Sequence, residues 1–173
     1  MTSRLSRLLV AVPLLFAVAL AACDSNGGDA PTPADVAGVY DVQEFRFRPN
    51  AGALSAANVL DTLVAENTSF EILDSGDAIL RYRIRGGQTR VLLGEVEVRT
   101  QEVRLQFESG SATARQQLLL PESLDFSREG DGLSASVETR ADLEAYDPDQ
   151  YDTFDNVLGR LTLRLSPRAD AGA

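Results

Sequence analysis

The chain has 173 residues, a mass of 18.6 kDa and a formal net charge of -10, which together suit a single acidic domain. Its 16 basic residues are all arginine, and the absence of histidine and lysine excludes a Ser-His triad, a Schiff-base lysine and a histidine-bound metal. The 26 acidic residues also argue against a nucleic-acid partner, because phosphate contacts need a basic surface. We therefore expect no enzyme activity and no cofactor.

The N-terminus has the pattern of an export signal. Arg4 and Arg7 precede an apolar stretch of 13 residues at 8–20, and small residues follow at Ala21 and Ala22. This stretch is shorter than the roughly 20 apolar residues that a transmembrane helix needs, and polar residues follow it directly. The sequence predicts cleavage after residue 22, which leaves 14 arginines against 26 acidic residues and a net charge of -12.

The cleavage site is formed by Leu20, Ala21, Ala22 and Cys23, and it resembles a bacterial lipobox. The resemblance implies that Cys23 carries a diacylglyceryl group and a further acyl chain, such as palmitate, at its amino terminus. Two or more acyl chains anchor a protein stably to a membrane. A soluble exported protein with a cysteine at this position is the alternative.

The residues after Cys23 predict a flexible tether and bear on which membrane holds the protein. Residues 23–35 are rich in glycine, proline and polar side chains without apolar periodicity, so we expect a flexible segment there. Asp24 resembles an inner-membrane retention signal of some enteric bacteria, but other bacterial groups do not follow that rule. We favour the outer membrane and leave open whether the protein faces the periplasm or the exterior.

The residues from 36 to 167 predict one antiparallel β-domain, with a disordered tail at 168–173. Apolar residues recur with a period of two, and short turns such as Gly86-Gly87 separate the runs as in hairpins. The strand candidates are 39–48, 70–72, 80–84, 92–98, 103–107, 118–120, 123–126, 133–137 and 157–165. For register, Val98 should oppose Val103, and Glu97 should oppose Arg104, across a turn at Thr100-Gln101.

The first strand predicts barrel closure. Tyr40 and Val42 share one parity whereas Phe45 and Phe47 share the other, so a bulge near Gln43-Glu44 would turn all four inward. A plain two-sided strand in a β-sandwich is the alternative. Between this strand and the next, apolar residues with helical spacing predict a short helix capped by Ser55. These residues are Ala56, Val59, Leu60, Leu63 and Val64. Because the segment is rich in β-branched residues, an extended crossing of the barrel end is the alternative.

The pattern of residues 36–167 is similar to that of the lipocalin-like (calycin) group. Gly38-Val39-Tyr40 resembles the G-x-W motif that opens the first strand in lipocalins, with tyrosine in place of tryptophan. The resemblance implies an up-and-down barrel of about eight strands, whose last strand pairs with the first and whose interior holds an apolar ligand. Arg160 and Arg164 are the candidates for the arginine that packs over the tryptophan in that family.

The interior predicts the class of ligand. The side chains that we expect to face inward are apolar, with Tyr40 and Tyr82 as polar handles, and such an interior excludes ions and sugars. The candidate ligand-binding residues are Tyr40, Phe45, Phe70, Leu80, Tyr82 and Leu92. These side chains could equally fill a solid core.

Two charged regions are candidates for further binding sites. The acidic loop at 146–156 offers Asp147, Asp149, Asp152 and Asp155 as calcium ligands, although a solvated acidic loop explains it as well. Three arginines on one strand face, Arg81, Arg83 and Arg85, could bind an anion, but pairing with Glu71, Glu95 and Glu97 on neighbouring strands is the favoured interpretation.

The sequence therefore supports two hypotheses. In the first, the protein is a lipid-anchored, non-enzymatic module of the cell envelope that binds a small hydrophobic ligand. In the second, it is a structural or interaction lipoprotein with a filled barrel core. An open apolar pocket favours the first hypothesis and a packed interior favours the second.

Overall fold

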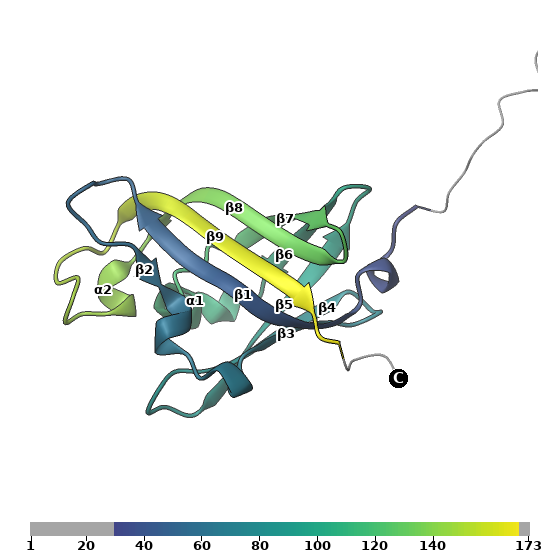
Figure 1. Ribbon diagram of the computed structural model, residues 1–173, viewed down its shortest axis with the longest axis horizontal. Coiled ribbons are helices and arrows are strands. Elements are labelled where there is room, and N and C mark those ends of the chain that lie inside the picture. Colours follow the sequence, from purple (N-terminus) through teal and green to yellow (C-terminus); the bar gives the residue numbers. More distant parts are fainter. Residues whose placement is uncertain (1–29, 170–173) are drawn as a thin grey trace, which may run out of the picture.

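The computed structural model describes residues 30–169 (Figure 1). The predicted signal peptide, the lipobox and Cys23 lie outside the described residues. Within the described range, no helix is long and apolar enough to cross a membrane.

The fold is a closed antiparallel barrel of eight strands in up-and-down order. Each strand pairs with the next along the chain, and the last strand pairs with the first, as expected (Figure 1). The barrel strands are β1 (Gly38–Pro49), β3 (Ser69–Ile72), β4 (Asp77–Arg83), β5 (Thr89–Val98), β6 (Glu102–Phe107), β7 (Ser123–Glu129), β8 (Gly132–Ala141) and β9 (Val157–Pro167). A ninth strand, β2 (Ala57–Asn58), pairs only with the end of β1, at Phe47 and Arg46.

Barrel closure depends on the predicted bulge in β1. The register between β1 and β9 shifts between Val42 and Glu44, so one additional residue of β1 is accommodated there. The shift turns Tyr40, Phe45 and Phe47 into the interior, where all three are buried, and Val42 is partly buried beside them. The bulge prediction is confirmed, and the sandwich alternative is wrong.

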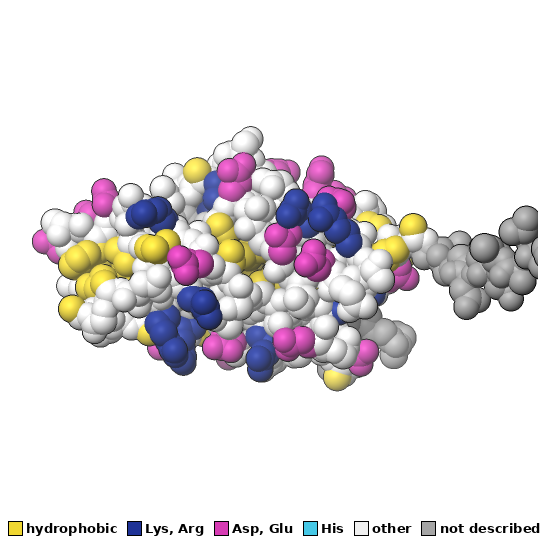
Figure 2. Space-filling view, turned by 90° about the horizontal axis from the view of Figure 1, so that it is seen from above, with side chains coloured by type: hydrophobic (Ala, Val, Ile, Leu, Met, Phe, Trp, Pro, Cys, Tyr) yellow, Lys and Arg dark blue, Asp and Glu magenta, His cyan; other side chains and the backbone are white. Residues whose placement is uncertain are grey.

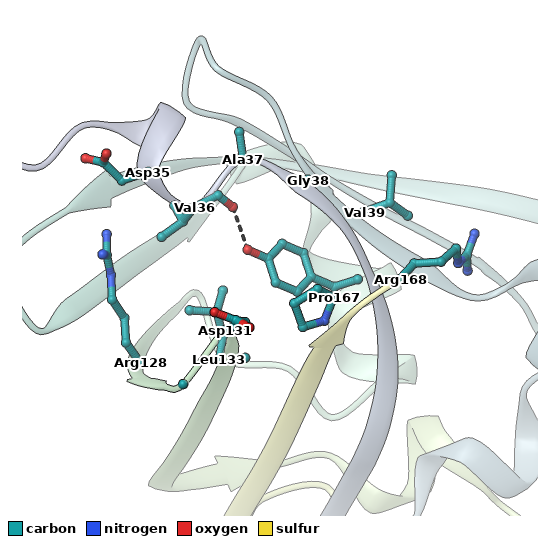
Figure 3. Close-up of a pocket in the computed structure, with 13 residues that line it drawn as sticks. Asp35, Val36, Ala37, Gly38, Val39, Arg128, Asp131, Leu133, Pro167 and Arg168 are labelled. Atoms are coloured by element: carbon teal, nitrogen blue, oxygen red, sulfur yellow. Dashed lines mark hydrogen bonds between the residues drawn. The ribbon is translucent and has the colours of Figure 1, made fainter. Parts of the chain in front are cut away.

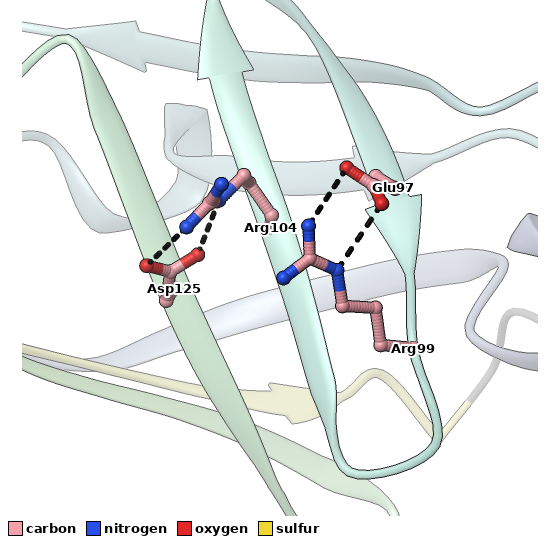
Figure 4. Close-up of polar contacts among 4 residues, drawn as sticks. All are labelled: Glu97, Arg99, Arg104 and Asp125. Atoms are coloured by element: carbon pink, nitrogen blue, oxygen red, sulfur yellow. Dashed lines mark hydrogen bonds and ion pairs between the residues drawn. The ribbon is translucent and has the colours of Figure 1, made fainter.

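The predicted hairpin register is also confirmed. Val98 opposes Val103 and Glu97 opposes Arg104, and the Arg99 amide donates to the Glu102 carbonyl oxygen at 2.8 Å. On the outer face, Arg104 pairs with Asp125 of β7 at 2.7 Å, and Glu97 pairs with Arg99 at 3.1 Å (Figure 4). Exposed pairs of this kind each contribute roughly 0.2 to 1 kcal/mol.

The arginines of β4 take different partners. Arg81 pairs with Glu71 of β3 at 3.8 Å, as the favoured interpretation predicts, while Arg83 donates from Nε to the Gly87 carbonyl oxygen at 3.0 Å. Arginines and acidic residues are interspersed over the barrel face shown in Figure 2, and apolar side chains gather toward one end of it. The outer surface is thus mixed in charge.

Two expected elements are wrong. The helix at 55–64 is replaced by β2 and two 3-10 turns, η2 (Val59–Thr62) and η3 (Ala65–Asn67). Two backbone hydrogen bonds with the end of β4 keep this segment from forming an α-helix. Val64 N donates to the Arg83 oxygen, and Arg85 N donates to the Thr62 oxygen. Residues 118–120, expected as a strand, instead follow helix α1 (Ala112–Gln117). Their backbone amides donate to carbonyl oxygens of the last turn of that helix.

The two ends of the barrel differ. The described chain enters and leaves at one end, which we call the terminal end (Figure 1). The opposite end, which we call the capped end, carries β2, α1 and α2 (Leu143–Tyr146).

The described termini belong to the fold beyond the boundaries predicted at 36 and 167. The 3-10 turn η1 (Pro33–Asp35) is held by Thr32 and Asp35 in a capping box. At the other end, the Arg168 amide donates to the Val39 oxygen at 2.8 Å, and its guanidinium pairs with Asp41.

The seam between β1 and β9 has no room for a side chain at Gly159. A Cβ there would lie 2.5 Å from both the Arg48 carbonyl oxygen and Cζ of Phe47. We expect Gly159→Ala to lower the free energy of unfolding by about 1 to 3 kcal/mol in urea titrations. Gly52→Ala is the matched control, because a Cβ at Gly52 contacts nothing within 4 Å. Equal stability of the two variants would contradict this account of the seam.

Candidate functional site

The six predicted ligand-binding residues all lie in the barrel interior. Phe45 of β1, Phe70 of β3, Leu80 and Tyr82 of β4 and Leu92 of β5 are at most 5% exposed, and so is Tyr40. The register places Leu80 directly opposite Leu92. Phe70 packs against Phe126 of β7 with ring centroids 6.3 Å apart, which joins opposite sides of the wall through the interior. The structure thus brings the predicted set together in one apolar core.

Tyr82 differs from the rest of this set because its hydroxyl is unsatisfied. The side chain is fully buried, and its oxygen has no hydrogen-bond partner among residues 30–169. Most buried hydroxyls in proteins have a partner, and one without a partner costs about 1 to 3 kcal/mol. The Tyr82 hydroxyl is therefore a donor directed into an apolar interior that does not use it.

Tyr40, the other predicted polar handle, is already engaged. Its hydroxyl donates to the Val36 carbonyl oxygen at 2.6 Å, at the terminal end of the barrel (Figure 3). Burial raises the pKa of this hydroxyl, and the positive charge of Arg128 opposes the rise. Of the two predicted handles, only Tyr82 retains an unused hydrogen bond.

The capped end is held in place by two tyrosines of the acidic loop. Tyr146 donates to the Asn58 carbonyl oxygen at 3.1 Å, and Tyr151 donates to the Ser55 carbonyl oxygen at 3.2 Å. Their rings pack with centroids 6.3 Å apart. The loop therefore holds the segment between β1 and β3 across the barrel end.

The carboxylates of the calcium hypothesis lie on this same loop. In the described part of the chain, no three acidic side chains come together as metal ligands. Asp147 instead caps the local turn by accepting from the Gln150 amide at 3.1 Å, while Asp149, Asp152 and Asp155 lie exposed. Tyrosine packing orients the backbone here, so the carboxylates face solvent.

Three consecutive leucines close the capped end from inside. Leu118, Leu119 and Leu120 are all at most 5% exposed, directly after α1. Leu119 has a φ of 57°, a left-handed conformation that costs a branched residue roughly 1 to 2 kcal/mol. Burial of all three side chains offsets that cost, which a strand with alternating sides could not achieve.

The barrel wall has a gap beside the middle of β1. On the edge of β1 that faces away from β9, β1 pairs with β3 only at residues 38–40 and with β2 only at 46–47. Within the described chain, residues 41–45 therefore have no strand partner on that edge. A pocket of about 260 Å³ occupies the gap. Its floor includes the buried residues Leu63 and Thr68, and its lining is completed by Asp41, Val42, Gln43, Leu60 and Ala65.

A second pocket, of about 420 Å³, lies at the terminal end (Figure 3). Tyr40 and Arg128 line it together with the first residues of β1, the turn between β7 and β8 and the end of β9. Arg128 continues the inward parity of Leu124 and Phe126 along β7. Arg160 and Arg164, the arginines expected to pack over the first-strand motif, both lie exposed on the outer face of β9 and do not reach Tyr40 in the interior.

The sequence contained a signal for Arg128 that a longer strand would have shown. The predicted strand ends at Phe126, whereas β7 continues to Glu129. Arg128 is the next inward position after Phe126. No pattern in the sequence predicts the hydrogen bonds of Tyr146 and Tyr151 to the segment between β1 and β3, since these loops are far apart in the chain.

Comparisons with known proteins give two weak structural similarities. No family model and no curated protein matches the chain. A lipocalin-like protein from Bacteroides uniformis has 13% sequence identity and a TM-score of 0.40, over 73% of this chain and 97% of that one. An uncharacterized protein from Bacteroides eggerthii has 10% identity and a TM-score of 0.34, over 72% and 98% of the two chains. Because these scores are low, the barrel assignment rests on the strand order and register described above.

The buried hydroxyl of Tyr146 at the capped end should make the free energy of unfolding depend on pH in the alkaline range. Burial, reinforced by Tyr151, Asp147 and Asp61, raises the pKa of Tyr146 to about 12. Folding therefore favours the protonated phenol, and this stabilisation is present below the ordinary pKa of about 10 and is lost as pH rises toward 12.

We expect the free energy of unfolding to fall between pH 10 and pH 12, and Tyr146→Phe to remove part of that dependence. Urea titrations at stepped pH, with ultraviolet titration of the tyrosines, measure both. An unchanged pH profile in the variant would exclude Tyr146 as the group responsible.

Proposed function

We propose that the protein is a lipid-anchored lipoprotein of the cell envelope whose barrel binds a small hydrophobic ligand without catalysis. The observation that supports ligand binding is the Tyr82 hydroxyl, buried among apolar side chains and without a partner in the described chain. A ligand with an apolar body and one polar head group would supply the missing hydrogen bond and fit the surrounding side chains.

The route of entry follows from the position of the wall gap. Tyr82 lies near the end of β4, and the following residues are joined to η2 and η3 through the bridge between Ile84 and Leu63. The pocket in the gap is lined by Leu60 and Leu63 of that same segment. A ligand entering beside β1 would thus reach the capped half of the interior, where Tyr82 lies.

Membrane anchoring is supported by the lipobox sequence ending at Cys23. Cys23 precedes Ala30, the first described residue, by seven positions, a span of at most about 25 Å. The described chain starts at the terminal end, so an acylated Cys23 would hold that end toward the membrane and leave the capped end facing away. We favour the outer membrane.

The alternative function is that of a structural or interaction lipoprotein with a filled core. The observations that favour it are the three buried leucines at the capped end and the Phe70–Phe126 contact across the interior. Ligand titration separates the two functions, because a filled core offers no saturable site.

The ligand hypothesis predicts opposite effects for two tyrosine variants. A fluorescent fatty acid should bind residues 23–173, with Cys23→Ser to prevent oxidation, in a saturable manner. Tyr82→Phe should weaken that binding about fivefold, the equivalent of one neutral hydrogen bond. It should not lower the stability of the ligand-free protein, because the hydroxyl that it removes is unsatisfied.

Tyr40→Phe is the matched control. It removes the bond to the Val36 oxygen, so it should lower the free energy of unfolding by about 1 kcal/mol and leave the affinity unchanged. Absence of saturable binding by the unsubstituted barrel would leave the filled-core function.

The lipid anchor depends on the sulfur of Cys23. Cys23→Ala in the complete chain should give either an uncleaved precursor or a soluble exported form, because the thioether to the lipid cannot form. Partitioning into the detergent phase of a cloud-point extraction measures the change. A variant that partitions as the natural chain does would refute the anchor.

A further inference from the structure

We infer that the pocket at the terminal end is an anion site, in which the Arg128 guanidinium binds a phosphate group. The site lies at the opposite end of the barrel from Tyr82 and is separate from the proposed ligand site. Its preferred source of phosphate, a phospholipid head group, rests on the proposed anchor at Cys23, whereas its chemistry does not.

Two of the three nitrogen atoms of the Arg128 guanidinium are buried without a partner in the described chain, although the residue as a whole is partly exposed. Arg128 continues the inward parity of β7, and its Nε and Nη2 atoms are inaccessible to solvent and donate to no acceptor among residues 30–169. Donors of a charged group that are withdrawn from water without an acceptor are unfavourable. An arginine so placed is stabilised when an anion occupies the adjacent space.

The adjacent space is large enough for such an anion. The pocket has a volume of about 420 Å³, and Tyr40 and Arg128 share its lining with Gly38, Gly130 and Gly132 (Figure 3). Side chains built at Gly38 and Gly130 would contact nothing within 4 Å, so the backbone there leaves room for a ligand. A guanidinium matches the oxygen spacing of phosphate through two parallel hydrogen bonds.

The other charged groups of the pocket do not neutralise Arg128. Asp35 accepts from the Thr32 amide at 2.7 Å, and Asp131 lies exposed on the turn between β7 and β8. Neither carboxylate forms an ion pair with Arg128 in the described chain. Arg168, the second cation of the lining, is already paired with Asp41. Arg128 is thus the cation of this pocket available to a ligand.

The location selects the source. The pocket is at the end where the described chain begins, which an acylated Cys23 would hold within about 25 Å of the bilayer surface. The phosphates of the head groups are the anions present there at high density. A free phosphate shares the same chemistry and is distinguished by experiment.

The test uses the acylated protein, labelled with nitrogen-15 and purified in an uncharged maltoside detergent. Inorganic phosphate should shift the Arg128 Nε–H resonance saturably and raise the melting temperature, compared with chloride at equal ionic strength. Micelles doped with phosphatidylglycerol should give the same shift, whereas micelles doped with diacylglycerol should not. A response to inorganic phosphate alone would identify a free phosphate as the ligand.

Arg128→Gln should weaken phosphate binding about tenfold or more, the effect expected for a hydrogen-bonded charge. Arg128→Lys should restore part of the affinity, because it keeps the charge and loses the planar fork. Arg160→Gln is the control, because Arg160 lies exposed on the outer face of β9 and does not line the pocket, so the affinity for phosphate should be unchanged.

The proposal is overturned if phosphate shifts no arginine resonance in the natural chain, or if Arg128→Gln binds phosphate as well as that chain does. Fatty-acid binding by Arg128→Gln keeps this test separate from the proposed function. A loss of phosphate binding with fatty-acid affinity retained supports the anion site, and a folding defect would remove both.

Discussion

The pairing of β1 with β9 is the constraint on which the rest of the structure depends. One edge of β1 is committed to β9 from Tyr40 to Pro49, and the bulge after Val42 is what keeps the inward side chains inward over that length. The other edge is then shared between β3 and β2, which meet it only near its ends. The wall gap and the terminal pocket both border β1, so both openings arise from the way in which this strand closes the barrel.

Within residues 30–169, two side chains, Tyr82 and Arg128, have buried polar atoms without partners, and they lie at opposite ends of the barrel. Tyr82 lies among apolar side chains of the core near the capped end, and Arg128 lines a pocket of mixed polarity at the terminal end. Replacement of either by an apolar residue of similar size would cost the fold nothing that the described contacts reveal. A neutral donor suits the polar head of an apolar molecule, and a guanidinium suits an oxyanion, so the two groups indicate two different ligands.

The barrel could be predicted from the sequence because period-two alternation specifies both strand and facing side. The bulge at Gln43 followed from a change of parity, and the turn at Thr100-Gln101 followed from opposing valines. The segment at 55–64 was mispredicted because its apolar spacing suits a helix, while hydrogen bonds to the distant residues Arg83 and Arg85 decide its conformation. No local pattern could show that the Tyr82 hydroxyl lacks a partner, since that depends on every side chain around it.

The charge of the protein explains why an arginine at the terminal end would matter for an anchored barrel. With the signal peptide removed as proposed, the chain would carry 26 acidic residues and 14 arginines, and an anionic bilayer would repel it, but only within a Debye length of about 10 Å. Ala30 follows Cys23 by seven positions, a span that can exceed that distance, so the proposed anchor alone would not force the barrel onto the lipid surface. A single head group bound by Arg128 would fix the terminal end against that repulsion. The wall gap, halfway along β1, would then remain clear of the membrane and accessible to a ligand.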